Sequence, residues 1–427
     1  MQSSDQDYDL VIIGGGLVGA SLALALQPLA ERLNWKICLV ENQPPAVEPD
    51  SQPSSLQASS LKTSFLQTWQ PSFDGRSTAL AWGTRQIYER LGLWDALQQH
   101  ANPIEHIQIT DRGFLGSTQL HNTEQQVHAL GYVVPNSWLG KVLWQGLAKA
   151  KNTHVLAPAA ITSVSFPSAE QAVLEGQVNG AALTLKARLV VLADGGRSGI
   201  KQQLGIADEV HNYEQSAIVA NVRMSKPHQG WAYERFATDG PMALLPLAGR
   251  DMALVWTRTS EQVAAEMGKN DAEFLHAIQQ SFGNRAGRFQ KVGERFAYPL
   301  KKVRAKEQVR RNLVLLGNTA HYLHPVAGQG YNLAIRGVMT LADALAKGAQ
   351  QAADNGQVFH PGELPLLQQW QAQRDLDQSS VIGFSHGLIA LFANDTPLLG
   401  HARAAGLIGL NLTAPLRRWI TAKAMGV

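Results

Sequence analysis

The stretch Asp9-Leu-Val-Ile-Ile-Gly-Gly-Gly-Leu-Val-Gly19 decides the fold of this chain. Its Leu-Val-Ile-Ile segment is apolar enough for a buried strand, and Ala20–Gln27 continues with the pattern of a helix. Between them, Gly14, Gly16 and Gly19 have the spacing G-x-G-x-x-G in a strand–turn–helix context, which is typical of dinucleotide binding. The first glycine permits the tight turn, the second lets a pyrophosphate approach the backbone, and the third lets the helix pack against the strand.

A second apolar segment, Ile37–Val40, ends at Glu41, where an acidic side chain can accept hydrogen bonds from an adenosine ribose. Leu17 and Val18 lie between the last two glycines and belong to the same loop. These features predict a Rossmann-like α/β domain with a mostly parallel sheet. The motif alone does not separate FAD from NAD.

A second loop of similar design follows the apolar segment Leu313–Leu316. Gly317-Asn318 ends that segment, and two further glycines precede a helical pattern from Asn332 onward. A helix that begins after such a loop aims backbone N–H groups at an electron-rich ligand. The predicted cofactor contacts of this loop are Asn318, Gly328, Gln329, Gly330, Tyr331 and Asn332.

Two shorter motifs add candidates. Asp194 closes the apolar strand Leu189–Ala193, at the end of a strand where open α/β sheets bind ligands. Arg76 precedes a predicted helix over Ala79–Leu91 and could place its guanidinium against a phosphate or a ribose. The alternatives are a plain turn at Asp194 and a local ion pair or helix cap at Arg76.

Residues 210–300 have the pattern of an antiparallel sheet. The predicted strands are Ser216–Met224, Trp231–Phe236, Ala243–Leu247 and Asp251–Trp256, and a helix is predicted over Glu261–Phe282. An apolar inner face would suit an apolar substrate, although each of its residues is also a candidate for the core. That face is formed by Phe236, Met242, Leu244, Pro246 and Trp256.

We therefore predict a discontinuous dinucleotide-binding domain (residues 1–85, 130–205 and 295–345) with an inserted substrate domain (86–129 and 206–294). Residues 346–427 form a C-terminal helical region, and the Pro-, Ser- and Gln-rich residues 43–72 are predicted to be a mobile insertion. The final segment of about forty residues is apolar yet cationic. It is either an interfacial element that touches a membrane or a helix that closes the core.

Composition excludes several classes of protein. A net charge of +3 without a block of Lys or Arg argues against a nucleic-acid partner. Cys38 is the single cysteine, which excludes an intrachain disulfide and a dithiol redox centre. We expect no signal peptide, no transmembrane helix and no metal site. The expected location is the cytoplasm, with the inner membrane as a candidate peripheral contact, and the sequence does not indicate an oligomeric state.

Taken together, these motifs resemble the flavin-dependent aromatic hydroxylases built like p-hydroxybenzoate hydroxylase, and among them the ubiquinone-biosynthesis branch. The resemblance spans nearly the whole chain. It is carried by G-G-G-L-V-G at 14–19, Glu41, D-G-R-S-T-A-L at 74–80, A-D-G-G-R-S at 193–198, E-R-F-A-T-D-G-P-M-A-L-L-P-L at 234–247 and G-N-T-A-H-Y-L-H-P-V-A-G-Q-G-Y-N-L at 317–333.

The resemblance implies a monooxygenase that uses FAD, O2 and NAD(P)H to hydroxylate a polyprenylated phenol or methoxyphenol through a flavin C4a-hydroperoxide. Gly14, Gly16 and Gly19 would hold the FAD pyrophosphate. The helix N-terminus near Gly330 would stabilise negative charge on the flavin. Pro325 would pack beside the flavin ring, and His324 would either assist a proton transfer or support the loop.

Three positions depart from the family pattern. Asn318 and Gly337 stand where the family has Asp, and Lys201 stands where Arg is usual. Asn318 can still hydrogen-bond a ribityl hydroxyl without charge. Two other functions stay open: a reductase or dehydrogenase with the same fold, and a non-catalytic flavin-binding subunit of a quinone-biosynthesis assembly.

Overall fold

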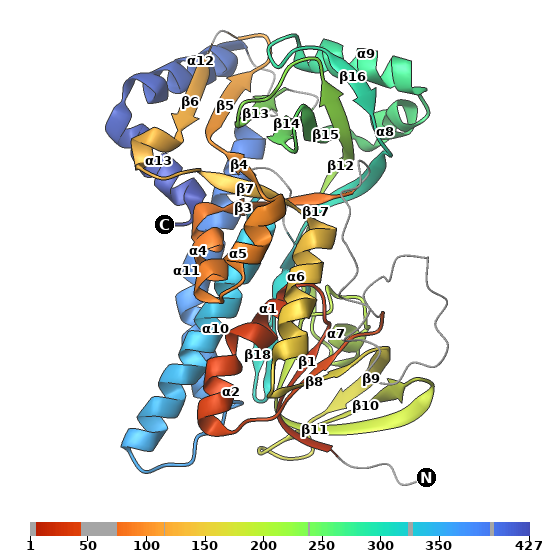
Figure 1. Ribbon diagram of the computed structural model, residues 1–427, viewed down its shortest axis with the longest axis vertical. Helices are drawn as coiled ribbons and strands as arrows, with labels where there is room; N and C mark the ends of the chain where they lie inside the picture. Colours follow the sequence, from red (N-terminus) through yellow and green to blue (C-terminus); the bar gives the residue numbers. More distant parts are fainter. Residues whose placement is uncertain (1–5, 44–74, 115, 238–239, 323–327, 393–396) are drawn as a thin grey trace.

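The computed structural model describes residues 6–43, 75–114, 116–237, 240–322, 328–392 and 397–427. The candidates His324 and Pro325 and nearly all of the predicted insertion at residues 43–72 lie outside this set. Figure 1 shows two parts stacked along the long axis of the molecule, with long helices running beside both. Parallel and antiparallel sheets with C-terminal helices confirm the predicted α/β fold class.

The first sheet has the strand order β18-β19-β11-β1-β2-β8, and its central strands are parallel. An antiparallel extension, β9 and β10, pairs with β11. Residues on β1 and β2 are buried on both faces, which explains their continuous apolar runs. The bounds are β1 Gln6–Ile13, β2 Ile37–Val40, β8 Thr153–Leu156, β9 Ala159–Ser165, β10 Ala172–Val178, β11 Ala181–Leu192, β18 Val309–Arg310 and β19 Leu313–Leu315.

Helices cover one face of this sheet and form the largest core, which includes Leu10, Leu22 and Ile335. The bounds are α1 Leu17–Ala25, α2 Gln27–Leu33, α4 Trp82–Arg90, α5 Trp94–Leu97, α6 Asn136–Lys149 and α10 Gln329–Asp354; α7 (Ile200–Gln203) packs near the other face. Tyr88 of α4 and Trp94 of α5 also lie in this core. The structure thus places residues 86–97 with the first sheet, whereas the sequence assigned them to the substrate domain.

One predicted helix begins too early. Residues Ser77–Ala81 form a strand, β3, and the helix α4 starts only at Trp82. β3 lies in a three-stranded sheet with β7 (Gly131–Pro135) and β4 (Asn102–Ile104). Pairing with β7, at least fifty residues away, determines the conformation of β3, and a local sequence pattern contains no information about that pairing.

The second sheet has nine strands, in the order β20-β17-β12-β15-β14-β13-β5-β6, with β16 paired to β12. Neighbouring strands are antiparallel except β5 and β13, which are parallel. The bounds are β5 His106–Asp111, β6 Ser117–His121, β12 Asp208–Met224, β13 Trp231–Phe236, β14 Met242–Pro246, β15 Asp251–Thr259, β16 Phe289–Val292, β17 Phe296–Ala305 and β20 His321–Tyr322. β17, assigned by the sequence to the dinucleotide-binding domain, lies in this sheet.

Two helices, α8 (Ser260–Met267) and α9 (Asp271–Phe282), follow this sheet where one helix was predicted. The first helix ends at Met267, and Asn270 starts a new helix with a capping box. The Asn270 side chain accepts the N–H of Glu273, and the Glu273 carboxylate accepts the N–H of Asn270.

Three helices complete the chain: α11 (Leu364–Phe392), α12 (Pro397–Leu412) and α13 (Ala414–Met425). α11 packs along α10, and α12 packs on β5 and β6 at the upper part of the molecule (Figure 1). A buried ion pair of 2.8 Å between Arg403 of α12 and Asp111 of β5 fixes this contact. Among the described residues, no helix combines the length and apolar character needed to cross a membrane.

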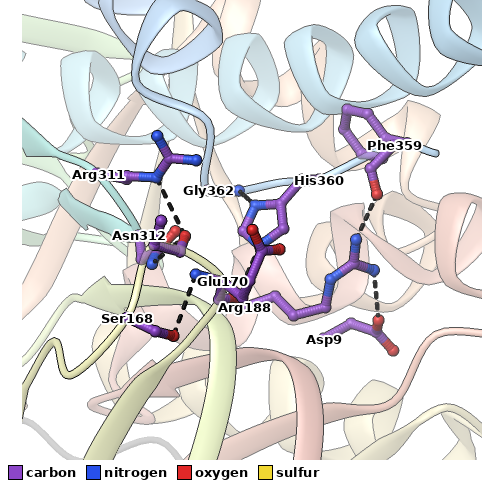
Figure 2. A network of polar contacts seen from close by, with 10 residues as sticks. Asp9, Ser168, Glu170, Arg188, Arg311, Asn312, Phe359, His360 and Gly362 are labelled. Atoms are coloured by element: carbon purple, nitrogen blue, oxygen red, sulfur yellow. Dashed lines mark hydrogen bonds and ion pairs between the residues drawn. The ribbon is translucent and has the colours of Figure 1, made fainter. Parts of the chain in front are cut away.

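A polar network fastens the connection between α10 and α11 to the first sheet (Figure 2). Arg188 of β11 donates to Asp9 of β1 at 3.1 Å and to the Phe359 carbonyl. His360 donates from Nε2 to the Glu170 carbonyl at 2.7 Å, while its Nδ1 accepts the N–H of Gly362. Because Asp9 lies early in β1, the network anchors the end of the domain opposite to the glycine loops.

Candidate cofactor and substrate site

Three loops that are far apart in the sequence meet at the carboxyl ends of the parallel strands. A Cβ on Gly14 would lie 2.7 Å from the Ala193 carbonyl oxygen and from Asp194 Cα. A Cβ on Gly317 would lie 3.1 Å from Cγ2 of Val18. Gly14 and Gly317 both have positive φ, at 105° and 61°, so glycine fits both the space and the backbone. The structure thus brings the three predicted cofactor loops together.

The glycines of the first loop have different surroundings. A Cβ on Gly19 would lie only 1.9 Å from the Gly14 carbonyl oxygen, so this glycine permits the close packing of α1 on the turn. A Cβ on Gly16 would meet no atom within 4 Å, which leaves open space in front of the loop. Gly16 is also the N-cap of α1 and supplies no side-chain cap. The first N–H groups of α1, including those of Leu17 and Val18, have no partner within the helix and are suited to a phosphate.

Glu41 lies beside the same loop. Its Oε2 accepts the N–H of Gly15 at 2.6 Å, and its Oε1 accepts the N–H of Gln43 at 2.9 Å. These bonds hold the carboxylate at the end of β2, next to the mouth of the glycine loop. A carboxylate oxygen has a second lone pair, so the same group can also accept a ribose hydroxyl.

Asp194 connects its own loop, which follows β11, to the loop that follows β19. It accepts hydrogen bonds from the N–H groups of Gly196 (3.0 Å) and Ser198 (2.6 Å) and from the hydroxyl of Thr319 (2.8 Å). Burial alone would raise the pKa of Asp194, but the hydrogen bonds led by Ser198 outweigh it and hold that pKa below its usual value. In the described contacts, the carboxylate acts as an organiser of the loops.

Asn332 has a similar organising role at the start of α10. Its side chain accepts the N–H of Ala81 at 2.8 Å and donates to the carbonyls of Ala79 and Gly328 at 3.0 and 2.8 Å. Gly328, the N-cap of α10, has a φ of 60° and supplies no side-chain cap. Asn332 therefore fixes α10 to β3, while the N–H groups of the first turn of α10, at Gln329 and Gly330, remain available as donors to an electron-rich ligand.

Three other predicted residues lie in different settings. Tyr331 contributes its hydroxyl to a buried hydrogen bond with Tyr88, which lies under α10 and not in the open space. Asn318 is exposed at the end of β19 and is free to face a ligand. Arg76 donates to the Tyr298 hydroxyl at 3.0 Å, which places its guanidinium between β3 and the second sheet.

The departures Lys201 and Gly337 have structural partners. Lys201 is buried and bridges Asp208 (2.8 Å) and the Thr319 carbonyl (3.3 Å), so it supports the third loop from behind. Gly337 lies against the buried guanidinium of Arg374, which occupies the place where a side chain at 337 would begin.

The residues predicted to form an apolar substrate face lie in the core. Met242, Leu244 and Trp256 are buried under α8 and α9, in a cluster with Phe274 and Ile278. Pro246 is also buried, and Phe236 packs on Leu407 of α12. The structure therefore matches the core alternative for these residues, because α8 and α9 cover one face of the sheet and α12 covers Phe236 on the other.

The other face of the second sheet is turned toward the cofactor loops. Ala232, Leu245 and Ala253 pack there with Val133 of β7 and Ala79 of β3. The Cβ of Ala79 lies 3.4 Å from the position of a Cβ on Gly328. This face of the second sheet thus packs against β3 and β7 and lies next to the start of α10.

The sequence reasoning did not single out Glu234, which lies on this face of β13. Glu234 is the first residue of the motif at 234–247, and the alternation of a strand places it on the same face as Ala232 and Phe236. A carboxylate between two apolar residues on one face of a strand was the feature that could have identified it. Separately, a cavity of about 220 Å³ opens on the opposite face, beside Gln108, Trp231 and Arg285. That cavity is separated from the cofactor loops by the sheet itself.

Comparison with known proteins supports the same cofactor. The family described as FAD binding domain matches residues 67–358, which is more than half of the chain. Ubiquinone hydroxylase UbiL of Rhodospirillum rubrum is 32% identical over 427 residues, covering 99% of this chain and 91% of that protein. The chain belongs to this family of FAD-dependent hydroxylases.

Other relatives of this hydroxylase agree. The 3-demethoxyubiquinol 3-hydroxylase of Escherichia coli is 28% identical, over 99% of this chain and 100% of that protein. The solved structure of p-nitrophenol 4-monooxygenase PnpA from Pseudomonas putida matches with a TM-score of 0.73 at 15% identity, covering 99% of both chains. The latter likeness establishes the fold only.

The residues present fit FAD. The open space before Gly16, the uncapped starts of α1 and α10 and the exposed amide of Asn318 lie on loops that contact one another. When bound, FAD supplies the redox chemistry that activates O2 for insertion into an organic substrate. The loops at Gly16 and Asn318 and the start of α10 would hold this cofactor, and the apolar face of the second sheet lies beside them.

Proposed function

We propose that this hydroxylase inserts one oxygen atom of O2 into the aromatic ring of a polyprenylated phenol or methoxyphenol in ubiquinone biosynthesis, with NAD(P)H as electron donor. The observation that carries this proposal is the similarity to UbiL over 99% of the chain, since UbiL is named a ubiquinone hydroxylase. The apolar sheet face beside the cofactor loops supports it, because a prenylated ring needs an apolar site.

The proposed site residues divide the work. Gly14, Gly16 and Gly19, with the N–H groups of Leu17 and Val18, bind the FAD pyrophosphate, and Glu41 binds the adenosine ribose. Arg76, Asn318 and the start of α10 at Gly328–Gly330 bind the ribityl and ring portions. Asp194, Tyr331 and Asn332 act from behind and hold these loops in place.

The experiment is a reaction of the FAD-loaded protein with a short-chain prenylated methoxyphenol, NADPH and 18O2. A product that is heavier by one labelled oxygen supports the proposal. Oxidation of NADPH without label in any product would favour the reductase or dehydrogenase alternative. A gene deletion that leaves cellular quinone unchanged would count against any role in that pathway, and a deletion rescued by a variant without bound FAD would favour a non-catalytic subunit.

We propose in addition that α12 and α13 touch an anionic lipid surface, from which a prenylated substrate would arrive. Ile408, Leu412, Leu416 and Trp419 expose 44%, 79%, 46% and 60% of their surface.

The same two helices are basic: residues 397–427 contain four Arg or Lys and no Asp or Glu. Arg403 and Arg417 are paired with Asp111 and Glu124, which leaves Arg418 and Lys423 exposed beside the apolar residues. Apolar and basic side chains together are typical of interfacial helices.

The test is co-sedimentation of the FAD-loaded protein with vesicles of phosphatidylcholine, with or without phosphatidylglycerol. We expect binding that needs the anionic lipid, weakens with salt and is lost in the double variant Leu412→Glu/Trp419→Glu. The control is Leu376→Glu, a change at a residue that is 79% exposed on α11. A wild-type protein that binds neither vesicle would overturn this proposal and favour a protein assembly as the contact.

A further inference from the structure

One transverse row of the second sheet faces the cofactor loops. Hydrogen-bonded register aligns Val219 of β12, Val255 of β15, Ala243 of β14, Glu234 of β13 and Ile109 of β5 across five neighbouring strands. Residues directly opposite one another on paired strands lie on the same face of a sheet. The row therefore forms a continuous strip that crosses the sheet, with a single carboxylate in it.

The strip is partly exposed, in contrast to the other face of the same strands. All five residues of the row retain partial exposure, whereas their sequence neighbours Ile218, Leu244 and Trp256 are fully buried under α8 and α9. Ala232, two residues before Glu234 on the same face, packs with Val133 and Ala79 near the start of α10. Ile109, at one end of the row, packs with Phe236 and Leu407 of α12, and the remainder of this apolar strip is suited to one face of an aromatic ring.

The carboxyl group of Glu234 has no hydrogen bond or ion pair to any described residue. Three titratable groups on the same face of the described strands either have a partner already or have a pKa too high to compete with Glu234. Asp111 is paired with Arg403, the Tyr298 hydroxyl accepts from Arg76, and Tyr213 has a pKa raised by burial. Burial likewise raises the pKa of Glu234 to about 8. A carboxyl group without a partner, on a face that is turned toward the cofactor loops, points to a ligand.

We propose that Glu234 is a catalytic residue that takes the proton from the phenolic hydroxyl of the substrate as the ring is hydroxylated. This inference rests on the proposed function, because it requires a phenol in the site. The O–H bond breaks, its electron pair stays on the phenol oxygen and the proton passes to the Glu234 carboxylate. The ring thereby becomes richer in electrons at the carbon that accepts oxygen. No further reactant is needed for this step.

The acid strengths suit the transfer. An ordinary phenol has a pKa of about 10, as in tyrosine. A carboxyl group that titrates near 8 is a much better match to such a phenol than an ordinary carboxyl group, and matched pKa values favour general base catalysis. Ala243, on the neighbouring strand β14, and Val255, one strand further on β15, would hold the ring without competing for its hydroxyl.

The experiment uses the FAD-loaded enzyme and two readouts from pH 6 to 10. The first is the ultraviolet band of phenolate when a prenylated methoxyphenol binds the oxidised enzyme without an electron donor. The second is the rate of hydroxylation.

For the wild type we expect the hydroxylation rate to rise with a midpoint near pH 8. In Glu234→Gln we expect that rise to be lost and the rate to fall by about 10²- to 10⁴-fold, with FAD content unchanged. Glu234→Asp should restore part of the rate. Glu209→Gln, at an exposed position of β12, is the matched control.

The outcomes separate the two proposals. A Glu234→Gln enzyme that keeps the wild-type rate and pH profile overturns the role of Glu234 and leaves the proposed function intact. Phenolate formation that depends on Glu234, without oxygen incorporation by the wild type, supports the role of Glu234 and overturns the proposed function. A wild-type enzyme that binds no phenol overturns both.

Discussion

The guanidinium of Arg374 lies against Gly337, with Nε 2.8 Å from the place where a Cβ on Gly337 would stand. Arg374 donates to Gln308 (3.2 Å) and to Nδ1 of His321 (3.1 Å), and it stacks on Trp370. Burial, followed by the positive charge of Arg374, lowers the pKa of His321 well below its usual value, so this histidine is neutral. Gly337 thus leaves room for the guanidinium of Arg374, which holds His321 of β20 by a hydrogen bond.

We predict that Gly337→Ala destabilises the protein by about 1–3 kcal/mol, because a new methyl group would displace a guanidinium held on three sides. Gly409→Ala is the control, since a Cβ on that helical glycine meets nothing within 4 Å. We expect the control to be neutral or to stabilise by up to about 1 kcal/mol. Thermal unfolding measures both, and a Gly337→Ala protein as stable as the control would show that Arg374 moves freely.

We predict opposite effects for two substitutions in the first glycine loop. Gly16→Val should leave the fold stable, because its side chain enters open space, but it should abolish bound FAD by filling the pyrophosphate position. Gly19→Ala should destabilise the protein itself, since its methyl group would overlap the Gly14 carbonyl oxygen at 1.9 Å. The flavin absorbance of the purified proteins and the melting temperature after removal of FAD are the measurements. Full flavin content in the Gly16→Val protein would refute the pyrophosphate assignment.

We predict that Asp111→Asn costs about 3–5 kcal/mol of stability, because it leaves the buried guanidinium of Arg403 without its carboxylate. Replacing both residues by apolar ones of similar size should cost much less. The control is Asp343→Asn, which removes the exposed 2.6 Å pair with Arg90 and should cost about 0–1 kcal/mol. Equal losses in the two single variants would mean that the pair between α12 and β5 is solvated in solution.

We predict that Glu234→Gln changes how stability depends on pH. The unfolded chain binds this proton with a pKa near the ordinary value of 4.5, and the folded protein with a pKa of about 8. The wild type should therefore lose stability relative to the variant as pH rises from about 4.5 to about 8, with no further relative loss above that. Melting temperatures across this range are the measurement. Parallel curves for the two proteins would mean that Glu234 is solvated, and Glu209→Gln should follow the wild type.

The sequence was most informative where local patterns determine the structure. Apolar strands that end in a loop were recognisable before Gly14, Asp194 and Gly317. These strands pair in one parallel sheet, as expected for a dinucleotide-binding fold. The strand β13 at Trp231–Phe236 was predicted with the bounds that the structure has.

Long-range contacts decided the remaining features. Ser77–Ala81 is a strand because β7 pairs with it, and alternation along β14 and β15 defines two faces without indicating which one α8 and α9 cover. The substrate face was therefore placed on Met242 and Trp256, on the side that the helices bury. Glu234 gains significance only when its row is seen to face the cofactor loops.

The helix α13 supports the start of α10. Gln329, in the first turn of α10, donates to the Ala424 carbonyl at 3.0 Å, and a Cβ on Gly83 would lie 2.6 Å from the Gly426 carbonyl oxygen. The start of α10 is thus braced by a helix whose other side carries the exposed Trp419. A disturbance of α13, such as its insertion into a lipid surface, would therefore be transmitted to the first turn of α10 through a single hydrogen bond.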